Sequence, residues 1–117
     1  MSLHTLPVDD LQTGAEIADR VAAFVRDQVV PFERDPRCGA HGPSDDLVAE
    51  LRGLARAAGL MTPHIRPDGS HLSHRATALV LRASGWSMLG PVALNVMAPD
   101  EGNMFLLGRV ATPAQQQ

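Results

Sequence analysis

The first third of the chain carries apolar residues at the spacing of one helical face. They recur every three or four positions from Gly14 onward, and charged residues fall between them. Pro31 lacks a backbone N–H and restricts the residue before it, so the helix is expected to end or bend there. Residues 1–13 show no strong period and are interpreted as a polar leader. The predicted apolar stripe consists of Ile17, Val21, Phe24, Val25 and Val29.

A second helix is predicted to begin after Ser44. A serine side chain can accept a hydrogen bond from the first free amides, and Asp45 and Asp46 suit the positive end of the helix dipole. Gly59 is expected to end this helix in a left-handed conformation, because glycine has no Cβ to clash there. The predicted inner face consists of Leu47, Val48, Leu51, Leu54, Ala55 and Ala58.

A third helix is predicted after Ser73, which is a similar start signal. Pro91 then opens a short apolar segment that runs to Met97, and residues 104–107 form another. No period-2 pattern typical of strands is found, so the chain is predicted to form an all-α domain over residues 14–117. Its four to five helices would pack as a bundle or an orthogonal array. The predicted inner side of the third helix consists of Ala76, Leu79, Val80 and Ala83.

The last residues have the pattern of another helix start. Thr112 can cap free amides, and Pro113 suits the first helical position. Ala114 and residues 115–117 supply only about one turn beyond this start, while a typical helix has about three. We therefore expect the chain to be cut off before the further domains of a larger protein.

Composition and charge exclude several classes of function. The 117 residues have a formal net charge of -3, and the 10 cationic residues are all arginines spread along the chain, which gives no electrostatic footprint for nucleic acid. The single cysteine, Cys38, excludes an internal disulfide and fits a reducing compartment. No signal-peptide pattern and no apolar run of membrane-spanning length is found. A cytoplasmic protein without nucleic-acid or membrane partners is expected.

Three groups of residues carry candidate chemistry. His71 and His74 have the spacing of one helical face, but no further ligands complete a zinc site, so no metal site is predicted. Cys38 follows an arginine that could activate it, yet no histidine and acid are placed beside it, which favours a free surface thiol. The carboxylate pair Asp100-Glu101 could do acid–base work, but it more simply occupies the first turn of a helix. The residues alone identify no catalytic set.

The order of residues in several segments is more specific than their chemistry. Residues 47–52, 57–64 and 72–74 read LVAELR, AAGLMTPH and LSH, and residues 90–104 contain GPVALN followed by APDEGNM. These segments resemble the N-terminal domain of acyl-CoA dehydrogenases. The run 90–104 is similar to the branch of that family in which an Ala-Pro-Asp-x-Gly-Asn-Met segment follows the fourth helix. Residues 107–117 are similar to the next family feature, a Gly-(Thr/Ser)-Pro-x-Gln helix start.

The resemblance implies a three-part enzyme, of which this chain matches the first part. In the family, an all-helical N-terminal domain precedes a middle β domain that binds FAD and a C-terminal four-helix domain that carries the catalytic glutamate. That glutamate removes the α-proton of an acyl-CoA thioester, and the flavin accepts a hydride from the β-carbon. The chain would therefore be the N-terminal orthogonal helical bundle of such an enzyme. It would be inactive alone and would bind no FAD by itself.

The resemblance also implies which residues line the acyl-chain cavity, because the fourth and fifth helices of this domain do so in the family. Positions 94, 97, 98 and 101 have the spacing of one helical face, if the helix tolerates the proline at position 99. For Leu94 and Met97, ordinary packing in the hydrophobic core is the alternative to contact with an acyl chain. Carried over by position, four residues would face the cavity and two would lie near its mouth or floor: Leu94, Met97, Ala98 and Glu101, then Asp100 and Asn103.

Two functions stay open at this point. The first is part of an FAD-dependent acyl-CoA dehydrogenase, whose substrate would be an acyl-CoA and whose partners would be copies of itself or other dehydrogenase subunits. The second is a standalone helical binding module that docks on dehydrogenase subunits or holds an acyl group.

Overall fold

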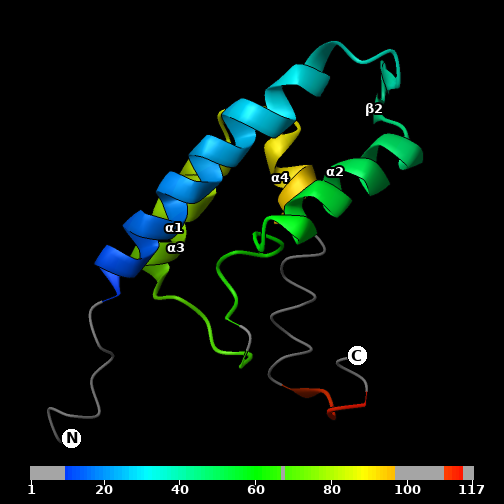
Figure 1. The fold of residues 1–117 in the computed structure, drawn as a ribbon. Helices are drawn as coiled ribbons and strands as arrows, with labels where there is room; N and C mark the ends of the chain where they lie inside the picture. Colours follow the sequence, from blue (N-terminus) through cyan, green and yellow to red (C-terminus); the bar gives the residue numbers. More distant parts are fainter. Residues whose placement is uncertain (1–9, 67, 97–109, 115–117) are drawn as a thin grey trace, which may run out of the picture.

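The computed structural model describes residues 10–66, 68–96 and 110–114, and these residues form a mostly helical structure (Figure 1). Two very short strands pair antiparallel in the loop before the second α-helix. The predicted all-α class is confirmed in this coarse sense, while the orthogonal arrangement stays a prediction. The helices are α1 (Leu11–Phe24), the π-helical η2 (Val25–Val29), the 3-10 helix η3 (Val30–Arg34), α2 (Asp45–Ala57), α3 (His74–Ser84) and α4 (Gly90–Leu94), and the strands are β1 (Cys38–Gly39) and β2 (Gly42–Pro43).

The first predicted helix is longer than expected at both ends. It begins at Leu11, and beyond Phe24 the chain continues helically through η2 and η3 as far as Arg34. Pro31 lies in the first turn of η3, where its missing N–H leaves no broken helical hydrogen bond. The helix therefore changes its winding before the proline and does not stop there. Four of the predicted stripe residues are buried and Ile17 packs against them half-buried; the buried four are Val21, Phe24, Val25 and Val29.

The predicted start and stop signals of the next two helices are confirmed. The Ser44 side chain accepts a hydrogen bond from the backbone N–H of Leu47 at 3.2 Å, and Ser73 accepts one from Ala76 at 3.2 Å. Each bond satisfies an amide that has no partner within its own helix. Gly59 follows α2 with φ +71°, the left-handed conformation expected there.

Helices α1 and α3 lie side by side with their N-terminal ends together (Figure 1). They approach so closely that a Cβ at Gly14 would lie 2.7 Å from the Cβ of Ala76. A carboxylate joins the two ends, because Asp10 accepts hydrogen bonds from both the backbone N–H and the hydroxyl of Ser73. These bonds lower the pKa of Asp10, with a smaller contribution from the charge of Arg66. Glycine is thus required sterically at the crossing, and the aspartate fixes its register.

The buried face of α3 differs from the predicted one at one position. Leu79 is 36% exposed, whereas Ser84, which was not predicted, is 1% exposed. Helix α1 covers only a narrow strip of the surface of α3, because the two helices approach closely at small side chains. Leu79 lies beside this strip and is therefore not covered by α1. The prediction for Leu79 is therefore wrong. The predicted positions that are buried are Ala76, Val80 and Ala83.

Helix α4 connects the α1–α3 pair to α2. It contacts α2, α3 and η2, and its first residue, Gly90, lies directly against the carbonyl oxygen of Ser84. The aliphatic side chains of all these helices form one hydrophobic core. None of the helices in the described ranges combines the length and the apolarity needed to cross a membrane.

A charged cluster holds the β1–β2 hairpin against α2. Arg37 donates to both carboxylate oxygens of Asp35 at 3.0 and 2.9 Å and also to the carboxylate of Glu50 on α2. The side-chain hydrogen bonds from Arg37, followed by its backbone N–H, lower the pKa of Asp35 to about 2. A carboxyl group whose pKa is lowered by folding stabilises the folded state only while it is ionised.

We predict that Gly14→Ala destabilises the chain although alanine is the better helix former. The added methyl group must displace Ala76, and overpacking of this kind typically costs roughly 1–3 kcal/mol. Gly53→Ala is the matched control, because Gly53 also lies within an α-helix and a Cβ there meets nothing within 4 Å. We expect the control to stabilise the chain by roughly 0.5–1 kcal/mol. Urea unfolding of both variants tests this, and equal effects of the two substitutions would contradict the close helix crossing.

We also predict that Asp35→Asn destabilises the chain in a pH-dependent manner. The folded-state pKa of Asp35 is about 2 and its ordinary value is 3.8, so the stabilisation is complete above that value. It should disappear as the pH falls from about 4 to about 2. Urea unfolding at several pH values should therefore show a difference between the parent and Asp35→Asn that shrinks in this window. Asp19→Asn, an exposed position on α1, serves as control, and a difference for Asp35→Asn that persists at low pH would refute the ion pair.

Candidate functional site at the end of helix α4

The one residue of the predicted acyl-chain site that lies in the described ranges is Leu94, the last residue of α4. The next residue, Asn95, has φ +56°, which is the left-handed conformation. Its N–H donates to the carbonyl of Val92 at 3.2 Å, and the N–H of Val96 donates to Pro91 at 3.0 Å. This pair of bonds is a Schellman motif, in which a left-handed residue stops the helix and satisfies its last carbonyls. Asparagine is one of the few residues other than glycine that adopts this conformation readily.

The helical-face prediction for positions 94 to 101 is therefore wrong. A single face requires one continuous helix through Leu94 and the three later positions, and the chain leaves the helix at Asn95. The contact of these residues with an acyl chain is a separate prediction that the end of α4 does not test. Five of the predicted site residues lie outside the described residues: Met97, Ala98, Asp100, Glu101 and Asn103.

The side chain of Leu94 has no exposed surface and belongs to the hydrophobic core. This placement agrees with the core-packing alternative for Leu94.

Two other segments hold the end of α4 in place. The backbone N–H of Thr62 donates to the carbonyl of Leu94 at 2.8 Å. On the other side, Arg52 of α2 donates from Nε to the carbonyl of Val92 and from Nη2 to the side-chain oxygen of Asn95, both at 3.1 Å. The last carbonyls of α4 are thus shared between its own Schellman motif, the loop after α2 and a half-buried guanidinium. Sequence reasoning missed Arg52, because a lone arginine on a predicted helix gives no signal of its distant partner.

Thr62 has an unusual backbone conformation. Its φ is +44°, which is strained for a β-branched residue. Such a conformation persists only where neighbouring interactions impose it, and here the bond to Leu94 does so. The loop around Thr62 and the end of α4 therefore hold each other in place through this hydrogen bond.

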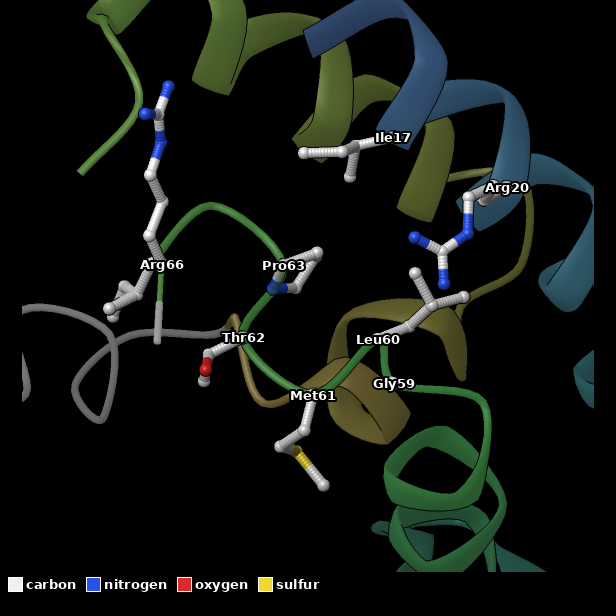
Figure 2. A pocket seen from close by; sticks show the side chains of 9 residues that line it. Ile17, Arg20, Gly59, Leu60, Met61, Thr62, Pro63 and Arg66 are labelled. Carbon is white, nitrogen blue, oxygen red and sulfur yellow. The ribbon is translucent and has the colours of Figure 1, made fainter. Parts of the chain in front are cut away.

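A cavity of about 450 Å³ lies on the α1 side of the same loop (Figure 2). Arg20 and Arg66 lie at opposite sides of the view, with the side chains of Ile17 and Pro63 between them. We call this space the Arg20–Arg66 cavity. Its lining consists of Ile17, Arg20, Gly59, Leu60, Met61, Thr62, Pro63, Ile65 and Arg66.

The histidine and cysteine predictions concern groups that the structure keeps apart from the end of α4. His74 is exposed in the first turn of α3, and His71 is half-buried, with its ring centroid 6.4 Å from that of the buried His64. No group of three or more potential metal ligands occurs among the described residues. Cys38 is half-buried and its thiol donates to the carbonyl of Phe32 at 3.5 Å, so the thiol is less exposed than predicted.

The chain is similar to known acyl-CoA dehydrogenases over most of its length. It is 29% identical over 112 residues to acyl-CoA dehydrogenase family member 11 of Gallus gallus, and 30% identical over 112 residues to the protein of that name in Rattus norvegicus. It is 33% identical over 104 residues to the probable acyl-CoA dehydrogenase FadE2 of Mycobacterium tuberculosis. These matches cover 83–89% of this chain. The chain is a relative of the acyl-CoA dehydrogenases.

The match concerns only part of each relative. The chain spans 14% of the length of the chicken and rat proteins and 25% of the mycobacterial protein. No family model matches the chain, and no solved structure matches it. The relationship to the acyl-CoA dehydrogenases therefore rests on the sequence similarity to these curated relatives.

We predict that Arg52→Met weakens the attachment of α4. The methionine keeps an apolar stem but cannot donate to Val92 or Asn95, and hydrogen bonds from a charged donor are worth roughly 1.5–3 kcal/mol. Amide hydrogen exchange should accelerate at Asn95 and Val96, and the free energy of unfolding should fall. Arg56→Met, an exposed position on the same helix, is the control. Unchanged exchange at the end of α4 in Arg52→Met would show that the guanidinium does not hold it.

Proposed function

We propose that this chain forms the N-terminal helical part of an FAD-dependent acyl-CoA dehydrogenase and contributes to the binding of the acyl chain. The observation that carries the proposal is the similarity to dehydrogenases over 83–89% of this chain but only 14–25% of theirs. A mostly helical structure fits the helical domain implied by the sequence motifs. We further propose a cytoplasmic location and assembly with copies of itself or with other dehydrogenase subunits.

The described residues do not fit an FAD molecule. FAD joins two ring systems through a pyrophosphate, and such a group is usually held by a glycine-rich turn at a helix N-terminus. The Arg20–Arg66 cavity combines two guanidiniums with aliphatic side chains and contains no such turn. Two further cavities, of about 350 and 170 Å³, are smaller. The flavin chemistry of the relatives therefore belongs, in this proposal, to parts of the enzyme that the matched segment does not include.

The proposed contribution of this chain is apolar contact and geometry. Met97 and Ala98 offer apolar surface, and each methylene of a ligand that they remove from water contributes roughly 0.8 kcal/mol. Leu94, held in the core, anchors the start of this segment. In the proposal, Glu101 also faces the acyl cavity, and Asp100 and Asn103 lie near its mouth or floor and bound it with polar groups.

The alternative, a standalone module that docks on dehydrogenase subunits or holds an acyl group, differs in what the chain does by itself. A module of that kind would bind an acyl-CoA without a further domain. A part of an enzyme would bind it weakly or not at all, because it provides only one wall of the cavity. Titration of the purified chain with octanoyl-CoA by calorimetry separates the two.

A chimera tests the leading proposal. The chain replaces the matching segment of the mycobacterial relative, and acyl-CoA dehydrogenation is measured for a series of acyl lengths. In this chimera, Met97→Trp should shift the preference toward shorter acyl groups, since the larger side chain occupies space that a long chain needs. Arg34→Gln, an exposed position in η3, should leave the preference unchanged.

Two results would contradict the proposal. A chimera that binds FAD and turns over substrate, yet keeps the same length preference with Met97→Trp, would remove Met97 from the acyl cavity. A yellow, active preparation of the chain alone would show that the flavin does not belong to the rest of the enzyme.

A further inference from the structure

The lining of the Arg20–Arg66 cavity carries two positive charges. Two of its lining residues are arginines, and no acidic residue is among the others within the described ranges. Its volume of about 450 Å³ falls within the range typical of small-molecule sites, which is roughly 300–1,000 Å³.

Arg20 retains most of its hydrogen-bonding capacity. Its Nη2 donates to the carbonyl of Ala58 at 3.2 Å, at the C-terminal end of α2. This bond positions the side chain beside the cavity and uses one of five N–H donors. No carboxylate of the described residues lies within 4 Å of it, because none of the ion pairs in this part of the chain includes Arg20.

Arg66 interacts with two carboxyl groups at longer range, because its charge helps to lower the pKa of both Asp10 and Asp68. An oxygen of the Asp10 carboxylate is 3.8 Å from the Nη2 of Arg66, which is too long for a hydrogen bond. Asp10 is already engaged by two bonds from Ser73, so its acceptor capacity is directed toward the α1–α3 joint. The Arg66 side chain is 45% exposed and can turn its donors to a ligand.

The surface between the two arginines is apolar. Ile17 and Pro63 occupy the space between them in the close view, and Leu60 lies beside the Arg20 head group (Figure 2). A ligand that spans the cavity would therefore meet a cationic group at each side and aliphatic carbon between.

We propose that the Arg20–Arg66 cavity binds an organic dianion in which two carboxylates are separated by a short apolar chain. Each guanidinium pairs with one carboxylate, and the apolar chain packs on Ile17, Leu60 and Pro63. The site is separate from the acyl-chain role proposed above and does not depend on it.

The loop that lines the cavity provides local reporters of binding. Residues 59–66 are tied to α4 through the bond from Thr62 to Leu94, so a bound ligand changes the environment of a constrained segment. The backbone amides of Gly59, Met61 and Ile65 are therefore suitable probes in a two-dimensional NMR spectrum.

The experiment is an NMR titration of the full chain with succinate, adipate and suberate, which carry the same charges at increasing separation. Hexanoate and hexanediol are the matched ligands with one charge and with none. At least one dicarboxylate should bind about tenfold more tightly than hexanoate, since its second carboxylate forms a second charge-assisted pair. The shifted amides should lie in residues 59–66. Hexanediol should bind more weakly than hexanoate.

Single substitutions test the two arginines separately. Arg20→Gln and Arg66→Gln should each reduce the affinity for the best dicarboxylate to about that of hexanoate. Arg34→Gln, far from the cavity lining, should leave it unchanged, and Arg20→Lys, which keeps a charge and a donor, should retain part of it. Circular dichroism confirms that each variant is folded.

Three results of a titration that shows binding would overturn the proposal. They are equal affinity for adipate, suberate and hexanoate, equal affinity of the parent and both glutamine variants, and shifts that lie outside residues 59–66. Absence of binding by all three dicarboxylates at millimolar concentration would overturn it as well.

Discussion

The hydrogen bond from Thr62 to Leu94 joins two parts of the structure for which we propose a function. It connects the loop after α2, which lines the Arg20–Arg66 cavity, to the last carbonyl of α4, from which the chain leaves toward the proposed acyl site. Thr62 accepts a left-handed backbone to make this bond, at a cost of order 1–3 kcal/mol. The cost is offset because a helix end buried without partners for its carbonyls would be still less stable. A movement of the loop after α2 is therefore coupled to the end of α4 through this hydrogen bond.

Arginines provide most of the long-range polar connections in the described part of the chain. Arg20 contacts the end of α2, Arg52 contacts the end of α4, and Arg37 bridges Asp35 and Glu50 across the hairpin. A guanidinium has several donors in a fixed plane, so one side chain can satisfy two acceptors at once. This explains how a core built mainly from small and medium aliphatic side chains, with Phe24 as a buried aromatic residue, is closed at its loops.

The fold brings α4 to an end directly before the segment that carries most of the predicted site residues. The α1–α3 pair and α2 form a rigid support, and α4 is short and stopped abruptly by Asn95. Asn95 is the last residue of GPVALN, one of the segments that resemble the acyl-CoA dehydrogenases.

Local sequence determined the elements and most of their boundaries. The serines before α2 and α3 cap those helices, Gly59 stops α2, and the apolar stripe of α1 is buried, because capping, chirality and periodicity act within a few residues. The sequence order also identified the family. The tertiary structure decided what depends on distant partners: Leu79 lies outside the contact because α1 packs closely at Gly14, and Asn95 ends α4 where spacing had suggested a continuing face. Arg52 and the Arg20–Arg66 cavity likewise depend on residues brought together from separate segments, and such proximity has no local signal in the chain.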